Sequence, residues 1–442
     1  MSRQYDAIII GSGIIGCAVS FEMAKRGYKT LNIDKLPAAG YGSTSNSCAI
    51  IRAHYSTWDG VAMAYENALY WDDWANYIGV EDERGLAKFI QCGCLILNRT
   101  ETDYKRWTDL FDQIGVPYEM WTLEQTLEKY PFMDPHTFYP PKALDDETFW
   151  DEPSEMLTGA IITPTMGYIS DPQLSTHNLM RAAEAHGGTF MFNQEVVAVR
   201  RDNDHFDLAQ HRRVTGITLK NGQKINAPIV VNVAGPHSFI INRLAGVEEG
   251  MNIKTKPLRH EVHHVPSPPS FDYEKEGTEL SDPAGIYCRP EVGRSILVGS
   301  EDPECDPREW VDDPDNFNRE LTDIQWKRQV YRLARRIPEL QIPSQPRGVV
   351  DLYDVADDWI PIYDKSDLPG FYMAVGTSGN QFKNAGGVGH MMAELITACE
   401  NGHDHDVDPI QVKMPYTGLV LNAGFYSRLR EINKDSSFSV LG

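Results

Sequence analysis

The sequence predicts an α/β protein whose parallel sheet is assembled from distant parts of the chain, and three observations support this. An apolar run at residues 7–10 indicates a buried strand that leads directly into a glycine-rich turn. Two further apolar strands, expected at residues 229–233 and 370–376, also end in turns of small residues. Helical patterns follow the first and last strands, as in a sheet covered by helices. The segments between them predict an inserted second unit and a partly α+β character.

The first turn carries the most informative motif of the chain. Gly11, Gly13 and Gly16 have the GxGxxG spacing, which gives a tight turn, close backbone approach to a pyrophosphate and close helix packing. The helix expected over residues 14–24 has one apolar face, and its N-terminus favours a diphosphate. The second strand ends in Asp34, which is placed to accept hydrogen bonds from ribose hydroxyls. Together these features predict a Rossmann-like dinucleotide site.

The motif does not choose between NAD and FAD. Many NAD enzymes also begin with a strand and a glycine-rich turn, so other segments must decide.

Composition limits the partners of the chain. With 442 residues it is too long for one simple core, so we expect two interleaved domains. The net charge of −22 argues against nucleic acid or an anionic membrane as a partner. We expect no membrane span and no signal peptide, because the apolar runs are short. Seven scattered cysteines indicate a reducing compartment, and we expect a cytoplasmic location.

Other elements follow from periodicity and turn residues. We expect helices at residues 59–79, after Asp171-Pro172 and at 323–337, strands at 89–97, 196–199, 214–219, 253–265, 284–289 and 295–299, a hairpin turn at Asn221-Gly222, an exposed excursion at 130–155, and a polar loop at 266–282.

Two groups of potential metal ligands do not predict a metal site. Cys92 and Cys94 lack a second pair to complete a ligand set, and an ordinary strand is the better interpretation. Among His260, His263 and His264, strand alternation separates the last two. We therefore expect no bound metal.

Four segments resemble the D-amino-acid oxidase superfamily of FAD enzymes, in particular its sarcosine oxidase and dimethylglycine dehydrogenase-like branch. They are the N-terminal fingerprint, residues 42–52, the turn at 233–238 and the glycine-rich turn at 376–389 with its embedded Lys383. The resemblance extends from Asp6 to about Glu400. It implies FAD bound in an extended form, with its isoalloxazine between two domains.

The resemblance also implies a domain division. A discontinuous, Rossmann-like FAD-binding domain would comprise residues 1–89, 152–243 and 346–410. A substrate-binding domain with a largely antiparallel sheet would comprise residues 90–151 and 244–345. Residues 411–442 would form a C-terminal extension. This extension is either a packed cap or an interface.

Cofactor contacts are implied residue by residue. The positions are Gly11, Ser12, Gly13, Ile14, Ile15, Gly16, Asp34, Lys35, Gly42, Ser43, Thr44, Ser47, Val196, Ala234, Gly235, Gly376, Gly379, Asn380, Gln381, Phe382 and Lys383.

The resemblance implies four residues at the substrate. Arg52 and Lys383 would clamp a substrate carboxylate, which a buried arginine fork can bind with two hydrogen bonds. Tyr287 and Tyr353 would line the pocket as walls. Arg52 could instead form a structural ion pair, and Lys383 could bond the flavin alone.

Three positions depart from the family pattern. Asp351 stands where some members carry a cysteine bonded to the flavin, so we expect non-covalent FAD. Leu297 replaces a lysine that faces the flavin and promotes reaction with oxygen. Ala49 replaces an arginine near the flavin of the monomeric enzymes.

These observations predict an FAD-dependent amine oxidoreductase. The reaction expected is oxidation of the C–N bond of a small carboxylate-bearing amine, most simply N-demethylation of a secondary or tertiary N-methyl amino acid, with oxygen or another electron acceptor. Deamination of glycine or a D-amino acid is an alternative. A second alternative is a flavoprotein subunit of a homo- or hetero-oligomer with little activity alone.

Overall fold

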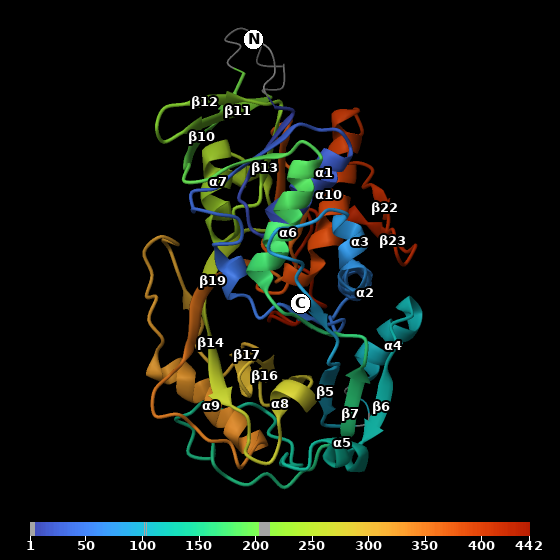
Figure 1. Cartoon of the computed structure of the whole chain (residues 1–442), viewed down its shortest axis with the longest axis vertical. Helices are drawn as coiled ribbons and strands as arrows, with labels where there is room; N and C mark the ends of the chain where they lie inside the picture. The colour runs from blue at the N-terminus through green and yellow to red at the C-terminus, as the bar shows by residue number, and fades with distance from the viewer. Residues whose placement is uncertain (1–4, 101, 103, 203–212) are drawn as a thin grey trace.

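The computed structural model describes residues 5–100, 102, 104–202 and 213–442, and two sheets dominate its two lobes (Figure 1). The first sheet has the strand order β20-β21-β13-β1-β2-β9. Its strands are β1 (Ala7–Ile10), β2 (Thr30–Ile33), β9 (Thr189–Met191), β13 (Ile229–Asn232), β20 (Ile362–Lys365) and β21 (Phe371–Val375). Every pair except β20–β21 is parallel. The prediction of a parallel sheet built from the start, middle and end of the chain is confirmed.

Helix α1 (Ile14–Lys25) is buried on all sides, which the sequence did not indicate. It packs between α6 (Pro172–Ala185) and α10 (Ala385–Glu400), so the predicted apolar face is buried and the other faces are buried as well. Its residues from Ile14 to Ala24 are all buried, including Glu22. The Glu22 carboxylate accepts from Arg26 at 2.8 Å and from Lys25 at 3.0 Å, which satisfies the one charge that this burial encloses.

A small three-stranded sheet and one helix lie on the opposite face of the first sheet. Its strands are β10 (Val196–Arg201), β11 (Val214–Leu219) and β12 (Lys224–Asn226), and α7 (Ser238–Ala245) packs beside them. The β11–β12 hairpin turns at Asn221-Gly222 as predicted.

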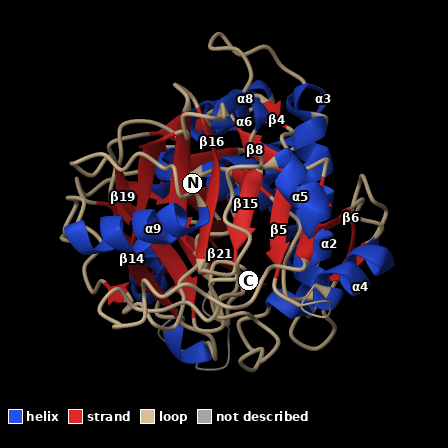
Figure 2. Cartoon of the chain, turned by 90° about the horizontal axis from the view of Figure 1, so that it is seen from below, coloured by secondary structure: helices blue, strands red, loops and turns tan. Residues whose placement is uncertain are grey.

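The second sheet is largely antiparallel and carries helix α9 (Asp323–Arg336) across its strands (Figure 2). Its order is β18-β14-β17-β16-β15-β5-β7-β6, and β19 pairs along β14. The strands are β5 (Cys94–Asn98), β6 (Glu119–Thr122), β7 (Gly159–Thr163), β14 (Thr255–Pro266), β15 (Glu279–Asp282), β16 (Ile286–Glu291), β17 (Ser295–Ser300), β18 (Glu309–Trp310) and β19 (Gly348–Ala356). Strands β7 and β19 lie within 152–243 and 346–410, two of the segments expected to form the FAD-binding domain. These two segments therefore contribute strands to both sheets.

The loop expected at residues 266–282 is wrong in its last part. Residues 279–282 form β15, all four of whose residues are buried between β5 and β16. Its polar residues can be buried because each has a partner inside the protein. Ser281 donates to Glu301 at 2.6 Å, and Asp282 accepts from Arg336 at 2.6 Å. Helix α8 (Tyr273–Glu276) precedes it.

Three other expectations need adjustment. The helix expected at 59–79 is interrupted at Asp73 into α2 (Trp58–Asp72) and α3 (Trp74–Ile78). The strand expected at 89–97 divides into β4 (Phe89–Ile90) and β5, because the chain turns at Gly93. The excursion at 130–155 is exposed only in part, since Tyr130 and Phe149 are fully buried.

A small sheet is formed by β3 (Ile50–Ile51), β8 (Gly167–Ile169) and β4. Two further helices are α4 (Lys105–Ile114) and α5 (Leu123–Lys129).

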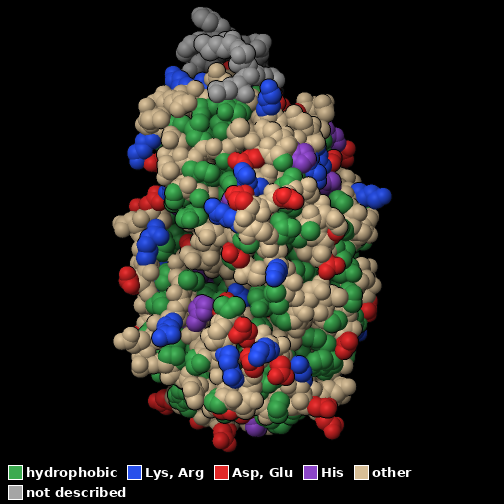
Figure 3. All heavy atoms as spheres, viewed as in Figure 1, with side chains coloured by type: hydrophobic (Ala, Val, Ile, Leu, Met, Phe, Trp, Pro, Cys, Tyr) green, Lys and Arg blue, Asp and Glu red, His purple; other side chains and the backbone are tan. Residues whose placement is uncertain are grey.

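The C-terminal extension packs against the first lobe and then runs between the lobes (Figure 1). Strands β22 (Gln411–Lys413) and β23 (Val420–Asn422) form a hairpin, and Val412, Leu421 and Tyr426 belong to the core around α1. Acidic and basic side chains are interspersed on the face in Figure 3. Among the described helices, none has the combined length and apolar character needed to cross a membrane.

Candidate active site

One cavity of about 510 Å³ runs from the glycine fingerprint to the second sheet. Its first wall is backbone, because no side chain fits there. A Cβ on Gly11 would lie 2.4 Å from the Val233 carbonyl oxygen, and one on Gly16 would lie 2.3 Å from the Gly11 oxygen. Both contacts are with neighbouring main chain, so glycine lets the fingerprint turn pack tightly against the end of β13.

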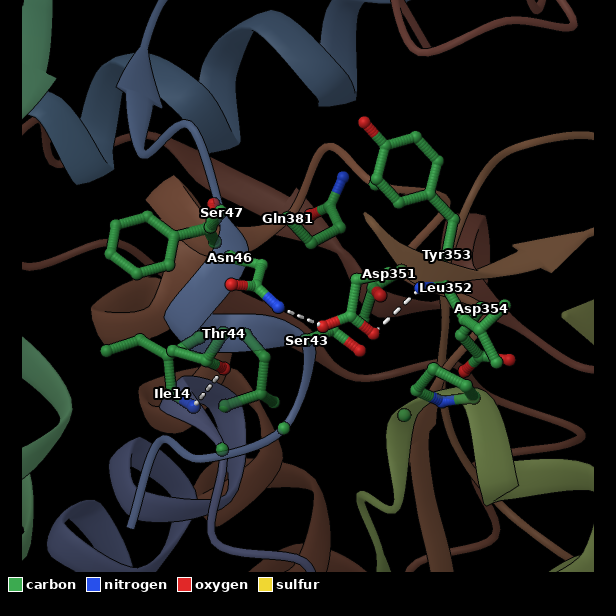
Figure 4. A pocket seen from close by; sticks show the side chains of 18 of the residues that line it. Ile14, Ser43, Thr44, Asn46, Ser47, Asp351, Leu352, Tyr353, Asp354 and Gln381 are labelled. Atoms are coloured by element: carbon green, nitrogen blue, oxygen red, sulfur yellow. Dashed lines mark hydrogen bonds between the residues drawn. The ribbon is translucent and has the colours of Figure 1, made fainter. Parts of the chain in front are cut away.

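Asp34 is fixed beside this turn. Its Oδ2 accepts from the Ser12 N–H at 2.7 Å, and its Oδ1 accepts from the Leu36 N–H at 2.9 Å. Burial raises the pKa of the Asp34 carboxyl, and the two N–H groups oppose that rise. Each oxygen keeps a lone pair for a further donor such as a ribose hydroxyl. The N–H of Ile14 donates to Thr44 Oγ1 at 3.2 Å, joining the helix start to the segment before Arg52 (Figure 4).

Nearly all predicted cofactor residues line this one cavity. Ser12 and Gly376 are the two that do not. The Ser12 backbone N–H donates to Asp34, and the Ser12 hydroxyl is buried without a partner. The Gly376 N–H donates to Asp354 Oδ2 at 2.7 Å. The fingerprint, residues 42–47, Val196 and residues 379–383 meet there although the sequence separates them widely, so the residues present fit an extended dinucleotide.

Asp351 also lines the cavity. Its carboxylate accepts from Asn46 Nδ2 at 2.7 Å and from the Leu352 N–H at 2.8 Å (Figure 4). Burial raises the pKa of Asp351. The side chain is thus held by hydrogen bonds and carries no sulfur nucleophile.

Arg52 is buried at the other end of the cavity. Its guanidinium donates to the carbonyl oxygens of His54 and Val440, and it lies 4.6 Å from the centre of the Tyr55 ring. No carboxylate in the described part of the chain pairs with Arg52, so the structural ion pair considered above is not present. Val440 belongs to the C-terminal extension, which the sequence did not connect with the site.

Lys383 meets Arg52 across the same tyrosine. Its Nζ donates to the Tyr55 hydroxyl at 2.9 Å and to the Asn380 carbonyl at 2.7 Å. Burial, and then the charge of Arg52, hold the pKa of Lys383 well below its usual range. Burial raises the pKa of Tyr55 to about 12, so its hydroxyl stays protonated. The sequence missed Tyr55, although it follows Arg52 by three residues.

Tyr287 and Tyr353 line the cavity as walls. The Tyr353 ring stacks on His260 with centroids 4.2 Å apart, and His260 Nε2 lies 2.8 Å from Asp302 Oδ1. The Tyr287 hydroxyl lies 3.1 Å from Cys48 Sγ. His263 is engaged elsewhere, with Gln329 at 2.8 Å and Glu261 at 3.1 Å. The histidines at 260 and 263 therefore have separate structural partners.

Leu297 is one layer behind the cavity wall. It packs against Tyr287 and Val262, both of which line the cavity, while Leu297 does not. The absence of a cation at this position beside the flavin stays a prediction. Ala49 does line the cavity and has a positive φ of 51°.

Three polar residues of the cavity were not predicted from the sequence. Glu279, Glu301 and His54 all line the cavity. Burial raises the pKa of Glu279 to about 7 and that of Glu301 to about 8. Burial and the charges of Arg52 and Lys383 hold the pKa of His54 well below its usual range. Only Leu280 is apolar in the segment from Glu279 to Asp282, so the sequence there gave no clear signal for a strand.

Comparisons with known proteins agree with this geometry. The family model described as "FAD dependent oxidoreductase" (DAO) matches residues 6–395. Human mitochondrial sarcosine dehydrogenase is 25% identical over 88% of this chain, which spans only 39% of that protein. The glycine oxidase of Geobacillus kaustophilus is 22% identical, with 91% of this chain and 96% of that protein covered.

A solved structure shows the same fold. The L-proline dehydrogenase of P. horikoshii superposes with a TM-score of 0.74 at 22% identity, covering 97% of this chain and 98% of that one. The family match over most of the chain, together with the cavity described above, assigns the chain to the DAO family of FAD-dependent oxidoreductases.

Proposed function

We propose that this chain oxidises the C–N bond of a small amino acid, most simply by N-demethylation of a secondary or tertiary N-methyl amino acid. One observation carries the proposal: Arg52 and Lys383 are both buried in the cavity that the fingerprint lines, on either side of Tyr55. A buried guanidinium beside a lysine is suited to a carboxylate.

The residues of the chain would divide the work along the cavity. Asp34 and the glycine turn would hold the adenosine and pyrophosphate of FAD, and residues 42–47 and 379–383 would lie along the flavin. Bound FAD would supply the hydride acceptor for the substrate carbon. Arg52 would hold the substrate carboxylate, exchanging its bond to the Val440 carbonyl for one to substrate. Tyr287 and Tyr353 would exclude water from the reacting carbon. The domain division given above and non-covalent binding of FAD are parts of this proposal.

The similarity to a glycine oxidase keeps deamination of a primary amino acid as the second candidate. The subunit alternative and a cytoplasmic location stay predictions, and one relative is a mitochondrial protein.

A substrate panel tests the proposal. The FAD-loaded protein is mixed without oxygen with sarcosine, N,N-dimethylglycine, glycine, proline or a D-amino acid, and loss of flavin absorbance is followed. Formaldehyde release supports demethylation, and ammonia release supports deamination. If no amine bleaches the flavin of the isolated chain, the proposal is wrong for this chain alone and the subunit alternative is favoured.

A further inference from the structure

The cavity contains a buried carboxylate whose role the carboxylate clamp leaves unexplained. Glu279 is 1% exposed, lines the cavity, and has a buried Oε2 atom with no hydrogen-bond partner. In the described part of the chain no basic group pairs with Oε2, and the partner of the carboxylate is the Cys94 thiol. Burying a carboxylate oxygen without a hydrogen-bond donor is unfavourable, and a ligand bound in the cavity would supply the missing donor to Oε2.

The backbone explains why Glu279 points into the cavity. In β15, side chains alternate between two faces. Leu280 packs in the core under α9 and Asp282 pairs with Arg336 of α9, so these two face the helix. Glu279 and Ser281 face the other way, where Ser281 donates to the cavity residue Glu301.

The charges around Glu279 come from several elements. Burial raises the pKa of Glu279 most strongly, and a hydrogen bond from the Cys94 thiol and the charges of Arg52 and Lys383 oppose that rise. The other titratable groups nearby are Cys92 and Cys94 at the start of β5, Cys288 of β16, Glu301 after β17 and His54 after β3. Their thiols have raised pKa values and stay neutral, and His54 stays neutral because its pKa is lowered.

We infer that Glu279 binds the amine of the substrate and accepts its proton, so that the site selects carboxylates with an N–H donor over their hydroxy or ether analogues. This inference rests on the proposed function and names the substrate class of that site. A carboxylate held at Arg52 and an amine held at Glu279 match the two ends of an amino acid. His54, whose two ring nitrogens are buried without partners, lines the same part of the cavity and is available for a further hydrogen bond.

The proton step balances without another reagent. The ammonium N–H bond breaks, the proton passes to Glu279 Oε2 and the electron pair stays on nitrogen. The amine is then neutral, which oxidation of the adjacent carbon requires. The positive charge of Arg52 disfavours an added ammonium, so it makes this proton easier to remove.

A binding experiment tests this role without turnover. Methoxyacetate has the carboxylate and length of sarcosine but an ether oxygen in place of the amine, so it cannot donate to Glu279. Its affinity for the FAD-loaded protein is measured from the flavin difference spectrum near pH 6 and near pH 8. If only the protonated Glu279 accommodates the ether, the Kd rises about tenfold over this range for a group that titrates near pH 7.

Matched variants separate Glu279 from its neighbours. Glu279→Gln should remove the pH dependence of the Kd, and Glu279→Asp should retain it. Glu301→Gln is the control in the same cavity and should also retain it, because Ser281 already occupies an oxygen of Glu301. With sarcosine, the rate of flavin reduction should rise with pH in the wild type and lose this rise in Glu279→Gln.

The outcomes also distinguish this inference from the proposed function. A wild-type Kd that does not change with pH, or the same pH dependence in wild type and Glu279→Gln, would overturn the role of Glu279 while leaving the carboxylate site intact. Failure of methoxyacetate to bind and of every amine to reduce the flavin would instead contradict the proposed function.

Discussion

Gly11→Ala isolates the contribution of the fingerprint turn to cofactor binding. Gly11 has a φ of +115°, and an added Cβ would lie 2.4 Å from the Val233 carbonyl oxygen. The backbone strain is of the order of 1–3 kcal/mol, and overpacking adds about 1–3 kcal/mol. The free energy of unfolding should therefore fall by about 2–6 kcal/mol, a large part of the 5–15 kcal/mol typical of a folded protein.

Gly27→Ala is the matched control. Gly27 also has a positive φ, of +87°, but an added Cβ meets nothing within 4 Å, and the residue does not line the cavity. Only the conformational part of the cost applies there, about 1–3 kcal/mol. The difference between the two variants therefore reports mainly the clash of Gly11 with the Val233 main chain after β13.

The assay has two readouts. Urea unfolding of the apoprotein gives the change in stability, and quenching of flavin fluorescence gives the Kd for FAD. We expect Gly11→Ala to weaken FAD binding at least about tenfold, which corresponds to 1.4 kcal/mol, and Gly27→Ala to leave it unchanged. Equal stability and equal FAD affinity in the two variants would refute the argument that the main chain at Gly11 must approach its ligand closely.

Three further predictions concern the flavin and its substrate. Arg52→Ala should reduce turnover of a carboxylate-bearing amine by roughly 10–150-fold, the equivalent of a lost charge-assisted hydrogen bond of about 1.5–3 kcal/mol, without reducing FAD content; unchanged kinetics would show that Arg52 only supports the Val440 segment. Acid precipitation should release all FAD into the supernatant, because Asp351 stands at the attachment position; flavin retained in the pellet would indicate a covalent bond to another residue. Reduced flavin should react more slowly with oxygen than with an artificial acceptor, because the uncharged Leu297 lies behind Tyr287 and brings no cation to stabilise superoxide; stopped-flow reoxidation as fast as turnover would contradict this.

Local pattern was enough to predict much of the first lobe. The strand at residues 7–10, the fingerprint turn, the helix that starts at Pro172 and the hairpin at Asn221-Gly222 all depend on residues close in sequence. Asp171 illustrates this, since its side chain caps the helix by accepting from the Leu174 N–H at 2.9 Å. Such signals are complete within a few residues.

Pattern failed where distant segments decide the environment. The sequence identifies one apolar face of helix α1, but α6 and α10 bury the other faces too. Strand β15 resembles a polar loop in sequence. It is buried because its polar side chains find partners in α9 and Glu301, which are distant in sequence.

The sequence by itself determined that this chain has a dinucleotide turn, an acid at the end of the second strand, and a lysine in a C-terminal glycine-rich turn. Only the tertiary structure decided that Lys383 and Arg52 meet at Tyr55, that Val440 accepts from Arg52, and that Glu279 lines the same cavity with its Oε2 unpartnered. The physical reason is that a turn or a helix cap depends on short-range spacing. The charge state and hydrogen bonds of a buried side chain depend instead on groups that folding brings from hundreds of residues away.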